Sequence, residues 1–338
     1  MTGSSHMELE IAEQPAMLRE RADAWMTQAK AIHAQCADRS EQVVVGRGSS
    51  GHACMFFSYV AGARTGRPAL ELRPWVTTQP TGPARWDAAT LYAFSASGQS
   101  TDVAHAATWM RERGGYVVGV SNNADPEANL ARAANTMFDL SIGPEVAVPA
   151  TKSFTAQLFA AAALAGEDVR PAATECAAAL EQIAESNLDE TLAGFVEGAR
   201  SLIFVARGPA LAAAADAALK FRETCAVPSV YFSSAEFLHG PVGAVGPADR
   251  VVLLEDTTDA KSMEAVLAQL LAREAPHTII VPRIPGAPAH ALRIAVPEVR
   301  WARTIALGYA TQRAALMLAK KLGFNPDEPR GLRKVTLT

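Results

Sequence analysis

The chain has 338 residues, a formal net charge of −4, 49% hydrophobic residues and 7% aromatic residues. This length suits two domains, and the composition is that of a globular protein rather than a disordered one. With 31 basic against 35 acidic residues, the charge offers no overall attraction to nucleic acid or to an anionic membrane.

In chain order, the hydrophobic pattern predicts leading helices followed by alternating strands and helices. Apolar residues at helical spacing predict helices between residues 11 and 37. Three units of strand, polar turn and helix follow, with strands at 43–45, 91–94 and 116–120. In the third unit, Asp125 is placed to cap a helix whose first residue is Pro126. This alternation is typical of βαβ units around a mostly parallel sheet.

The second half of the chain repeats this order. Residues 152–200 are rich in alanine and predict helices that connect two domains. The strand predicted at 202–205 leads into Arg207-Gly208, just as the strand at 43–45 leads into Arg47-Gly48. Further strands are predicted at 251–254, 278–281 and 292–296, and a final helix at 305–321. The repeated order indicates a duplicated α/β domain.

The cysteine and histidine spacings predict no metal centre and no redox motif. The four cysteines form no C-x-x-C pair, and the seven histidines form no H-E-x-x-H motif. Four thiols fit a reducing compartment, and we identify neither a signal peptide nor an apolar run of the roughly 20 residues that span a bilayer. We therefore expect a cytoplasmic protein with no metal, no other cofactor, and no nucleic-acid or membrane partner.

Two polar turns in the first half predict an anion site. Residues 95–101, Ser-Ala-Ser-Gly-Gln-Ser-Thr, join a predicted strand to a helix, and Gly48-Ser49-Ser50 follows the neighbouring strand. At this edge of a sheet, free backbone N–H groups and the helix dipole favour an anion, and hydroxyl donors suit a phosphomonoester. The alternatives are a plain Ser/Gly loop with a helix cap, and a dinucleotide site in which Glu71 would bind the ribose.

Six sequence blocks carry a family resemblance, and they are GRGSSGHA (46–53), SASGQSTD (95–102), VPATKSFTAQL (148–158), ALKFRET (218–224), SAEFLHGPVGAV (234–245) and DEPRGLRKVT (327–336). In this order the blocks resemble the sugar-isomerase (SIS) domain pair of the isomerase half of glucosamine-6-phosphate synthase and of stand-alone glucosamine-6-phosphate deaminases. Residues 10–15, EIAEQP, are similar to the family's entry to its first helix.

The resemblance implies an α/β fold with two tandem SIS domains. Each domain would be a mostly parallel sheet flanked by helices, in a flavodoxin-like or Rossmann-like three-layer arrangement. The expected boundaries are 1–40 for N-terminal helices, 41–190 for a first SIS domain that holds the phosphate site, and 191–338 for a second SIS domain with the C-terminal tail.

The resemblance also implies site residues. The expected substrate-binding residues are Gly48, Ser49, Ser50, Ser95, Ser97, Gly98, Gln99 and Ser100 for the phosphate, and Val148 and Ala150 for the sugar. Glu223 would move a proton between C1 and C2, and Lys220 would line the same site. His239 would open the sugar ring from the neighbouring subunit of a homodimer. Lys334 would pair with the open-chain substrate or form an imine with it.

Each catalytic assignment has a plainer alternative. Lys220 and Glu223 could be a solvated i,i+3 pair, His239 a turn residue, and Lys334 part of a flexible tail. The family turn usually reads S-x-S-G-E-T, whereas Gln99 and Ser100 occupy its last two positions here and Ala96 replaces a polar residue. Taken together, however, a carboxylate, a ring-opening group and a cation are what proton transfer between adjacent sugar carbons requires.

The expected reaction is the release of ammonia from an amino-sugar phosphate. Met1 is followed by Thr2 rather than by a catalytic cysteine, and we find no counterpart of the glutaminase domain that supplies ammonia to the synthase. The sequence therefore predicts conversion of glucosamine 6-phosphate to fructose 6-phosphate and ammonia. Two alternatives stay open, a fructosamine 6-phosphate deglycase and a non-catalytic sugar-phosphate sensor.

Overall fold

The computed structural model describes residues 4–80, 82–123, 125–256, 260–283 and 291–334. They form two compact units, each built around one five-stranded sheet. The first-sheet unit comprises residues 17–145, 152–173 and 333–334. The second-sheet unit comprises residues 4–16, 146–151 and 174–332.

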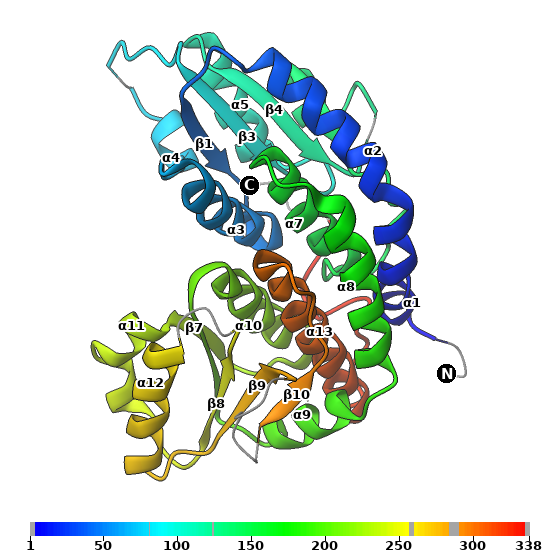
Figure 1. Ribbon diagram of the computed structural model, residues 1–338, viewed down its shortest axis with the longest axis vertical. Helices are drawn as coiled ribbons and strands as arrows, with labels where there is room; N and C mark the ends of the chain where they lie inside the picture. Colours follow the sequence, from blue (N-terminus) through cyan, green and yellow to red (C-terminus); the bar gives the residue numbers. More distant parts are fainter. Residues whose placement is uncertain (1–3, 81, 124, 257–259, 284–290, 335–338) are drawn as a thin grey trace. The chain divides into compact units, whose positions relative to one another are not determined.

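The first half of the chain builds one sheet and its covering helices (Figure 1). The strands are β1 (Glu41–Val45), β2 (Leu70–Glu71), β3 (Ala89–Phe94), β4 (Tyr116–Ser121) and β5 (Thr136–Asp139). The helices beside this sheet are α2 (Gln14–Gln35), α3 (Gly48–Thr65), α4 (Pro74–Thr77), α5 (Thr101–Glu112), α6 (Asn129–Ala133) and α7 (Lys152–Leu164). Helix α1 (His6–Ala12) precedes them in the chain and belongs to the second-sheet unit. The chain passes from the first-sheet unit into the second-sheet unit within α8 (Val169–Ala184).

The second half builds the other sheet. Its strands are β6 (Ser201–Ala206), β7 (Ser229–Ser233), β8 (Asp249–Leu254), β9 (His277–Pro282) and β10 (Leu292–Ile294). Its α-helices are α9 (Leu188–Val196), α10 (Leu211–Cys225), α11 (Ser234–Leu238), α12 (Ala260–Ala272) and α13 (Arg303–Lys321). Short 3₁₀ turns lie at Gly208–Ala210, Pro241–Ala244 and Arg300–Ala302.

The two sheets have the same strand order. The first runs β2-β1-β3-β4-β5, and the second, read from β7, runs β7-β6-β8-β9-β10. Every strand pair in both sheets is parallel. The order 2-1-3-4-5 is that of flavodoxin-like sheets, in which the winding direction reverses between the first and third strands. The predicted α/β duplication is confirmed down to its topology.

Alternation along the strands gives each sheet two buried faces. Val43 and Val45 of β1 pack with Leu91 of β3 in one cluster, which also contains α5 and α6 residues. The opposite face carries Tyr92, whose ring centroid lies 4.8 Å from that of Phe57 on α3. Helices therefore cover both faces, which explains why the strands read as continuous apolar runs.

The second sheet divides its faces in the same way. Val205 of β6 and Leu253 of β8 share a core cluster with α11 and α12 residues. On the other face, the rings of Phe204 and of Phe221 on α10 lie 5.6 Å apart. Helix α10 contacts α13 on that side (Figure 1). Burial of one aromatic side chain in such a layer stabilises the fold by about 2–3 kcal/mol.

Two local predictions were wrong. Helix α6 begins at Asn129 instead of Pro126, because Asp125 accepts a hydrogen bond from Glu127 N (2.9 Å) and closes a separate turn before the helix. Helix α3 begins at Gly48, so that Gly48-Ser49-Ser50 is the first helical turn and not a loop in front of it. The serine hydroxyls therefore lie in the first turn of a helix, where the backbone N–H groups have no carbonyl partner within the helix.

None of the helices described by the structure is both long and apolar enough to cross a membrane.

Candidate functional site

The two polar turns of the first-sheet unit lie next to one another. Strands β1 and β3 are parallel neighbours, with Val45 opposite Ala93. Gly46-Arg47 and the first turn of α3 (Gly48–Ser50) follow the end of β1, and the Ser95–Ser100 turn follows the end of β3. Both therefore lie at the carboxyl edge, at the point where the winding direction reverses, which is the usual ligand position in open α/β sheets.

The β3–α5 turn is held by hydrogen bonds to its carbonyl groups. The four bonds run from Asn122 N to Ala96 O (3.0 Å), from Asn123 Nδ2 to Ser97 O (3.0 Å), from Leu130 N to Gly98 O (2.9 Å) and from Asn129 Nδ2 to Gln99 O (3.0 Å). Because these bonds fix the carbonyl oxygens, the peptide dipoles of the turn are oriented before any ligand arrives. Such preorientation is the main requirement of an anion site made from backbone groups.

Gly98 is required at the centre of this turn. Its φ is +67°, and a Cβ atom added there would lie 3.0 Å from Ser121 Oγ and 3.3 Å from Asn123 Cβ. Both the left-handed backbone and the close approach of β4 exclude a larger residue.

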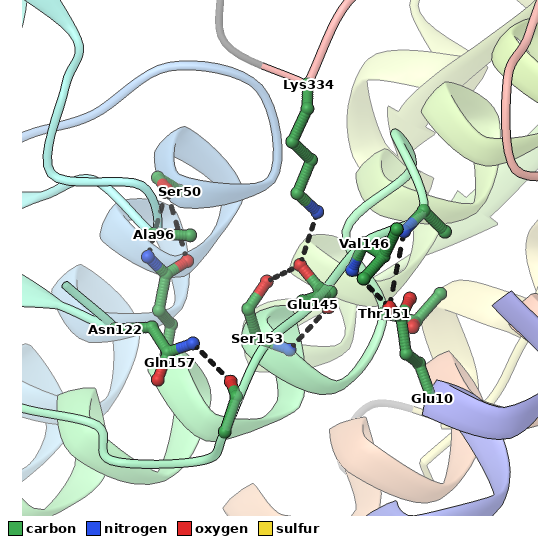
Figure 2. Close-up of polar contacts among 12 residues, drawn as sticks. Glu10, Ser50, Ala96, Asn122, Glu145, Val146, Thr151, Ser153, Gln157 and Lys334 are labelled. Atoms are coloured by element: carbon green, nitrogen blue, oxygen red, sulfur yellow. Dashed lines mark hydrogen bonds and ion pairs between the residues drawn. The ribbon is translucent and has the colours of Figure 1, made fainter. Parts of the chain in front are cut away.

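The serine hydroxyls of the two turns have local partners. Ser97 Oγ accepts from Gln99 N (3.2 Å), and Ser100 Oγ donates to Asp102 Oδ1 (2.8 Å). Ser50 Oγ lies 3.0 Å from Gln157 Nε2 and 3.2 Å from Gln157 Oε1 on α7 (Figure 2). Ser49, Ser50 and Ser95 are buried. The fold therefore holds these hydroxyls in place. A bound oxyanion would replace their local hydrogen bonds with its own.

An ion pair connects the turns. Arg47 Nε, before α3, donates to Asp102 Oδ2 at 2.5 Å, while Ser100 occupies the other carboxylate oxygen. Burial works to raise the pKa of Asp102, but the hydrogen bonds from Arg47 and Ser100 prevail and lower it. The negative charge of Asp102, beside the β3–α5 turn, is thus compensated by the guanidinium of Arg47.

Lys334 lies against a buried carboxylate of the first-sheet unit. Its Nζ is 2.8 Å from Glu145 Oε2, and the side chains are 31% and 4% exposed. Ser153, on α7, donates to Glu145 from its backbone N (2.9 Å) and its Oγ (2.6 Å) (Figure 2). Burial works to raise the pKa of Glu145, but the Lys334 ammonium and Ser153 hold it below its ordinary value. The tail lysine is therefore bound, contrary to the flexible alternative.

The segment that carries Val148 and Ala150 belongs to the second-sheet unit and is held by α1 and by the start of α2. Glu10 Oε1 accepts from Val146 N and Ala147 N. Gln14 Nε2 donates to Gln312 Oε1 (2.8 Å), and Gln312 Nε2 donates to Thr151 O (3.4 Å). These contacts give a physical reason for the EIAEQP sequence, since its first and fifth residues position this segment.

Val148 itself is tied to the residues before the C-terminal tail. Its N–H donates to Asp327 O at 2.8 Å, while Asp327 caps α1 through His6 N and Met7 N. Val148 and Ala150 are both half-buried.

Lys220 and Glu223 share one face of α10 in the second-sheet unit. Lys220 Nζ lies 3.2 Å from Glu223 Oε2, and the Lys220 and Glu223 side chains are 1% and 20% exposed. The alternative of a solvated surface pair is wrong for Lys220, because an almost fully buried ammonium has lost its water and needs its counter-charge. Glu223 is the partner that remains accessible.

His239 is exposed and follows α11 directly. Ser233 and Glu236 form a capping box at the start of that helix, with Ser233 Oγ accepting from Glu236 N (3.2 Å) and donating to Glu236 Oε2 (2.7 Å). At the other end, His239 N donates to Glu236 O (3.1 Å). One glutamate thus fixes both ends of the short helix that presents the imidazole.

Within the described residues, no three His, Cys, Asp or Glu side chains are grouped so as to hold a metal ion.

The geometry of both halves agrees with a known domain family. The family model of the SIS domain matches residues 37–166 and 196–297, one segment for each sheet. The chain belongs to the SIS domain family. Its two sheets are tandem SIS domains, as the sequence resemblance implied.

A curated relative of the SIS chain is the glutamine–fructose-6-phosphate aminotransferase (isomerizing) of Aeropyrum pernix. It is 28% identical over 359 aligned residues, which cover 96% of this chain and 56% of that protein. The chain thus spans about half the length of this relative. This agrees with the sequence resemblance, which was to the isomerase half of the synthase.

Solved structures of similar fold cover nearly the whole chain. A candidate phosphosugar isomerase from Silicibacter pomeroyi has a TM-score of 0.84 at 28% identity, covering 96% of this chain and all of that one. The C-terminal domain of glucosamine-fructose-6-phosphate aminotransferase from Francisella tularensis has a TM-score of 0.86 at 18% identity, covering 97% and 99% of the two chains. The second likeness is one of fold alone.

Several residues that shape the SIS site were given no role from the sequence. These supporting residues are Glu10, Gln14, Asp102, Asn123, Asn129, Glu145 and Gln312. Some of them lie in segments with a sequence signal: Glu10 and Gln14 in EIAEQP, Asp102 at the end of SASGQSTD, and Asn123 in the polar Ser121-Asn122-Asn123 run after a predicted strand. The others act through partners far away in the sequence.

The Gly98→Ala variant is expected to bind a phosphomonoester about tenfold more weakly, because the new methyl group strains and displaces the turn. The measurement is calorimetric titration with glucitol 6-phosphate, which has no carbonyl group and cannot react. Gly143→Ala is the matched control, since its φ is +71° but nothing lies within 4 Å of its added Cβ. Equal losses in both variants would show that backbone strain alone, and not this turn, affects binding.

The Lys334→Met variant should be destabilised most at neutral pH. In the wild type the pKa of Glu145 is lowered from 4.5, so its stabilising contribution is present above that pH and is lost as the pH falls through the folded-state pKa. Without Lys334 the buried carboxylate is costly when charged, and we expect a loss of about 1–3 kcal/mol in the free energy of unfolding at pH 7.5 and less at pH 4. Urea denaturation at both pH values measures this difference.

Lys321→Met is the control for this pair. Lys321 and Glu197 are 42% and 48% exposed, so the loss of their interaction should be small at both pH values. A Lys334→Met deficit that does not change between pH 4 and pH 7.5 would contradict the role given to Glu145.

Proposed function

We propose that this SIS protein acts on the phosphorylated amino sugar glucosamine 6-phosphate and releases ammonia to give fructose 6-phosphate. The observation that carries the proposal is the pairing, on α10, of a buried Lys220 with an accessible Glu223 carboxylate. A carboxylate held by a buried cation is a general base placed in a fixed position. The name of the Aeropyrum pernix relative supports a sugar phosphate and an amino group as reacting groups, since it combines fructose 6-phosphate with amino transfer.

The phosphate is assigned to the turns after β1 and β3. The N-terminal N–H groups of α3 and α5 favour a dianionic ligand over an uncharged one, and so do the hydroxyls of Ser50, Ser95, Ser97 and Ser100. Gly48, Ser49, Gly98 and Gln99 contribute backbone groups. Val148 and Ala150 are assigned to the sugar through their backbone groups.

The proposed reaction begins with ring opening by His239, which moves the O1 proton to the ring oxygen and gives the aldehyde. Glu223 then takes the C2 proton; the electrons of the C2–H bond form a C1=C2 double bond, and the carbonyl electrons move to O1. We assign to Lys334 the cation that stabilises this developing charge. Lys220 is assigned to hold Glu223 in place.

The second half of the reaction returns the proton. Once O1 has gained a proton, Glu223 delivers its own proton to C1, and the nitrogen lone pair forms a C2=N bond. Water adds to this ketimine at C2, and ammonia leaves as the C2 carbonyl forms. One water is consumed, and one ammonia is released for each fructose 6-phosphate.

Purified protein mixed with glucosamine 6-phosphate is expected to release ammonia and fructose 6-phosphate in equal amounts. The Glu223→Gln variant should lower kcat by roughly a hundredfold to ten-thousandfold, because the amide cannot accept the C2 proton. Coupled assays for both products measure the reaction. Glu264→Gln, which changes an exposed carboxylate on α12, is the matched control and should retain wild-type activity.

Two other outcomes would overturn this function. Release of a free amino acid from fructosamine 6-phosphate adducts, without ammonia release from glucosamine 6-phosphate, would identify a deglycase. Tight binding of sugar phosphates with no turnover, unchanged in Glu223→Gln, would identify a sensor.

We further propose that the active form is a homodimer in which His239 serves the neighbouring subunit. The exposure of its imidazole at the end of a rigid short helix supports this assignment. If Glu223→Gln and His239→Ala chains are mixed and exchange subunits, half of the dimers are hybrids with one intact site, so about a quarter of wild-type activity should return. No recovery after proven exchange would contradict a shared site.

A further inference from the structure

A third charged residue completes the Lys220–Glu223 pair. Asp216 lies one turn before Lys220 on α10, and its Oδ1 is 3.6 Å from Lys220 Nζ. Glu223 lies one turn after Lys220. The spacing of i, i+4 and i+7 places all three side chains on one helix face. Lys220 is therefore held between two carboxylates.

The three side chains differ in their access to solvent. Asp216 and Lys220 are 2% and 1% exposed, whereas Glu223 is 20% exposed. The buried carboxylate thus faces only the protein, and the accessible one faces outward. The buried Asp216–Lys220 ion pair therefore supports the more accessible Glu223 carboxylate, and the three charges do not form a symmetric network.

The charges of Asp216 and Lys220 become important when Glu223 takes up a proton. A protonated Glu223 is neutral and no longer compensates the Lys220 ammonium, which has almost no contact with water. A buried charge that loses its partner is strongly destabilised. Asp216 does not exchange protons with the substrate, so it remains a counter-charge for Lys220 at this stage.

We propose that Asp216 is a positioning residue for proton transfer, which holds Lys220 in place and compensates its charge while Glu223 carries the substrate proton. This inference rests on the proposed function, because it assigns the proton to Glu223. The proton moves from C2 to Glu223 and then to C1, and Asp216 neither gains nor loses one. Its effect is on the state in which Glu223 is protonated, and not on substrate binding.

The test compares Asp216→Asn, Lys220→Met and the double variant. Asp216→Asn should lower kcat about tenfold or more while KM changes less than about twofold, because only the protonated Glu223 state is affected. The isotope effect with C2-deuterated glucosamine 6-phosphate should rise. In the Lys220→Met background, the same change should alter kcat by less than about twofold, since no ammonium is left to compensate.

Two further variants separate positioning from folding. Asp189→Asn removes another carboxylate that is mostly buried, paired with Arg313 at 2.6 Å in the same unit, and should leave kcat and the isotope effect unchanged. Asp216→Glu keeps the charge and should retain most of the wild-type kcat, even if Asp216→Asn fails to fold. An Asp216→Glu variant that folds but is as slow as Lys220→Met would overturn the proposal, as would wild-type kcat and isotope effect in Asp216→Asn.

Exchange of the C2 proton in D₂O, followed by NMR, distinguishes this inference from the proposed function. Wild-type exchange without ammonia release would refute deamination, and slower exchange in Asp216→Asn would still support the role of Asp216. Absence of both C2-proton exchange and product formation in the wild type would overturn both. Equal exchange rates in the wild type and Asp216→Asn would overturn the role of Asp216 alone.

Discussion

The parallel pairing of β1 with β3 is the constraint on which the candidate phosphate site depends. Because the winding direction reverses between these strands, α3 and α5 lie on opposite faces of the sheet, and the chain segments that lead into them lie side by side at its edge. Helices α3 and α5 begin at that edge, and the first N–H groups of a helix have no carbonyl partner within the helix. The glycine and serine residues act on this edge only because the sheet brings the two turns together.

Buried charges serve a common purpose in the two units. Glu145 is buried and holds the partly exposed Lys334, while Lys220 is buried and holds the partly exposed Glu223. In each pair the buried ion is fixed by further contacts, from Ser153 in one case and from Asp216 in the other. Since a buried charge cannot be left without a partner at low cost, each pair fixes its accessible group firmly.

The duplication shows how one topology carries different chemistry. At the edge of the second sheet, β8 ends before Glu255 and Asp256, whereas β3 ends before three serines and a glycine. A carboxylate pair repels the anion that the serine turn would attract. The second-sheet unit instead supplies the α10 charges and the exposed His239. Duplication thus gave two scaffolds of one topology, and the residues at their edges diverged.

Seven of the ten strands in the described residues could be predicted from sequence alone, because hydrophobic periodicity and polar turns are local signals, whereas β2, β5 and β7 were not predicted. The sequence also named the serine turns as candidates, and the family resemblance named Glu223, His239 and Lys334; the roles of these residues stay predictions. The supporting residues could not be predicted in this way. Glu145, Asn129 and Gln312 act through partners brought near only by folding, and Asp216 looks like any helical aspartate until burial removes its water. Sequence therefore determined the elements and the chemistry-bearing groups, and tertiary structure decided which charges are buried and hold the others in place.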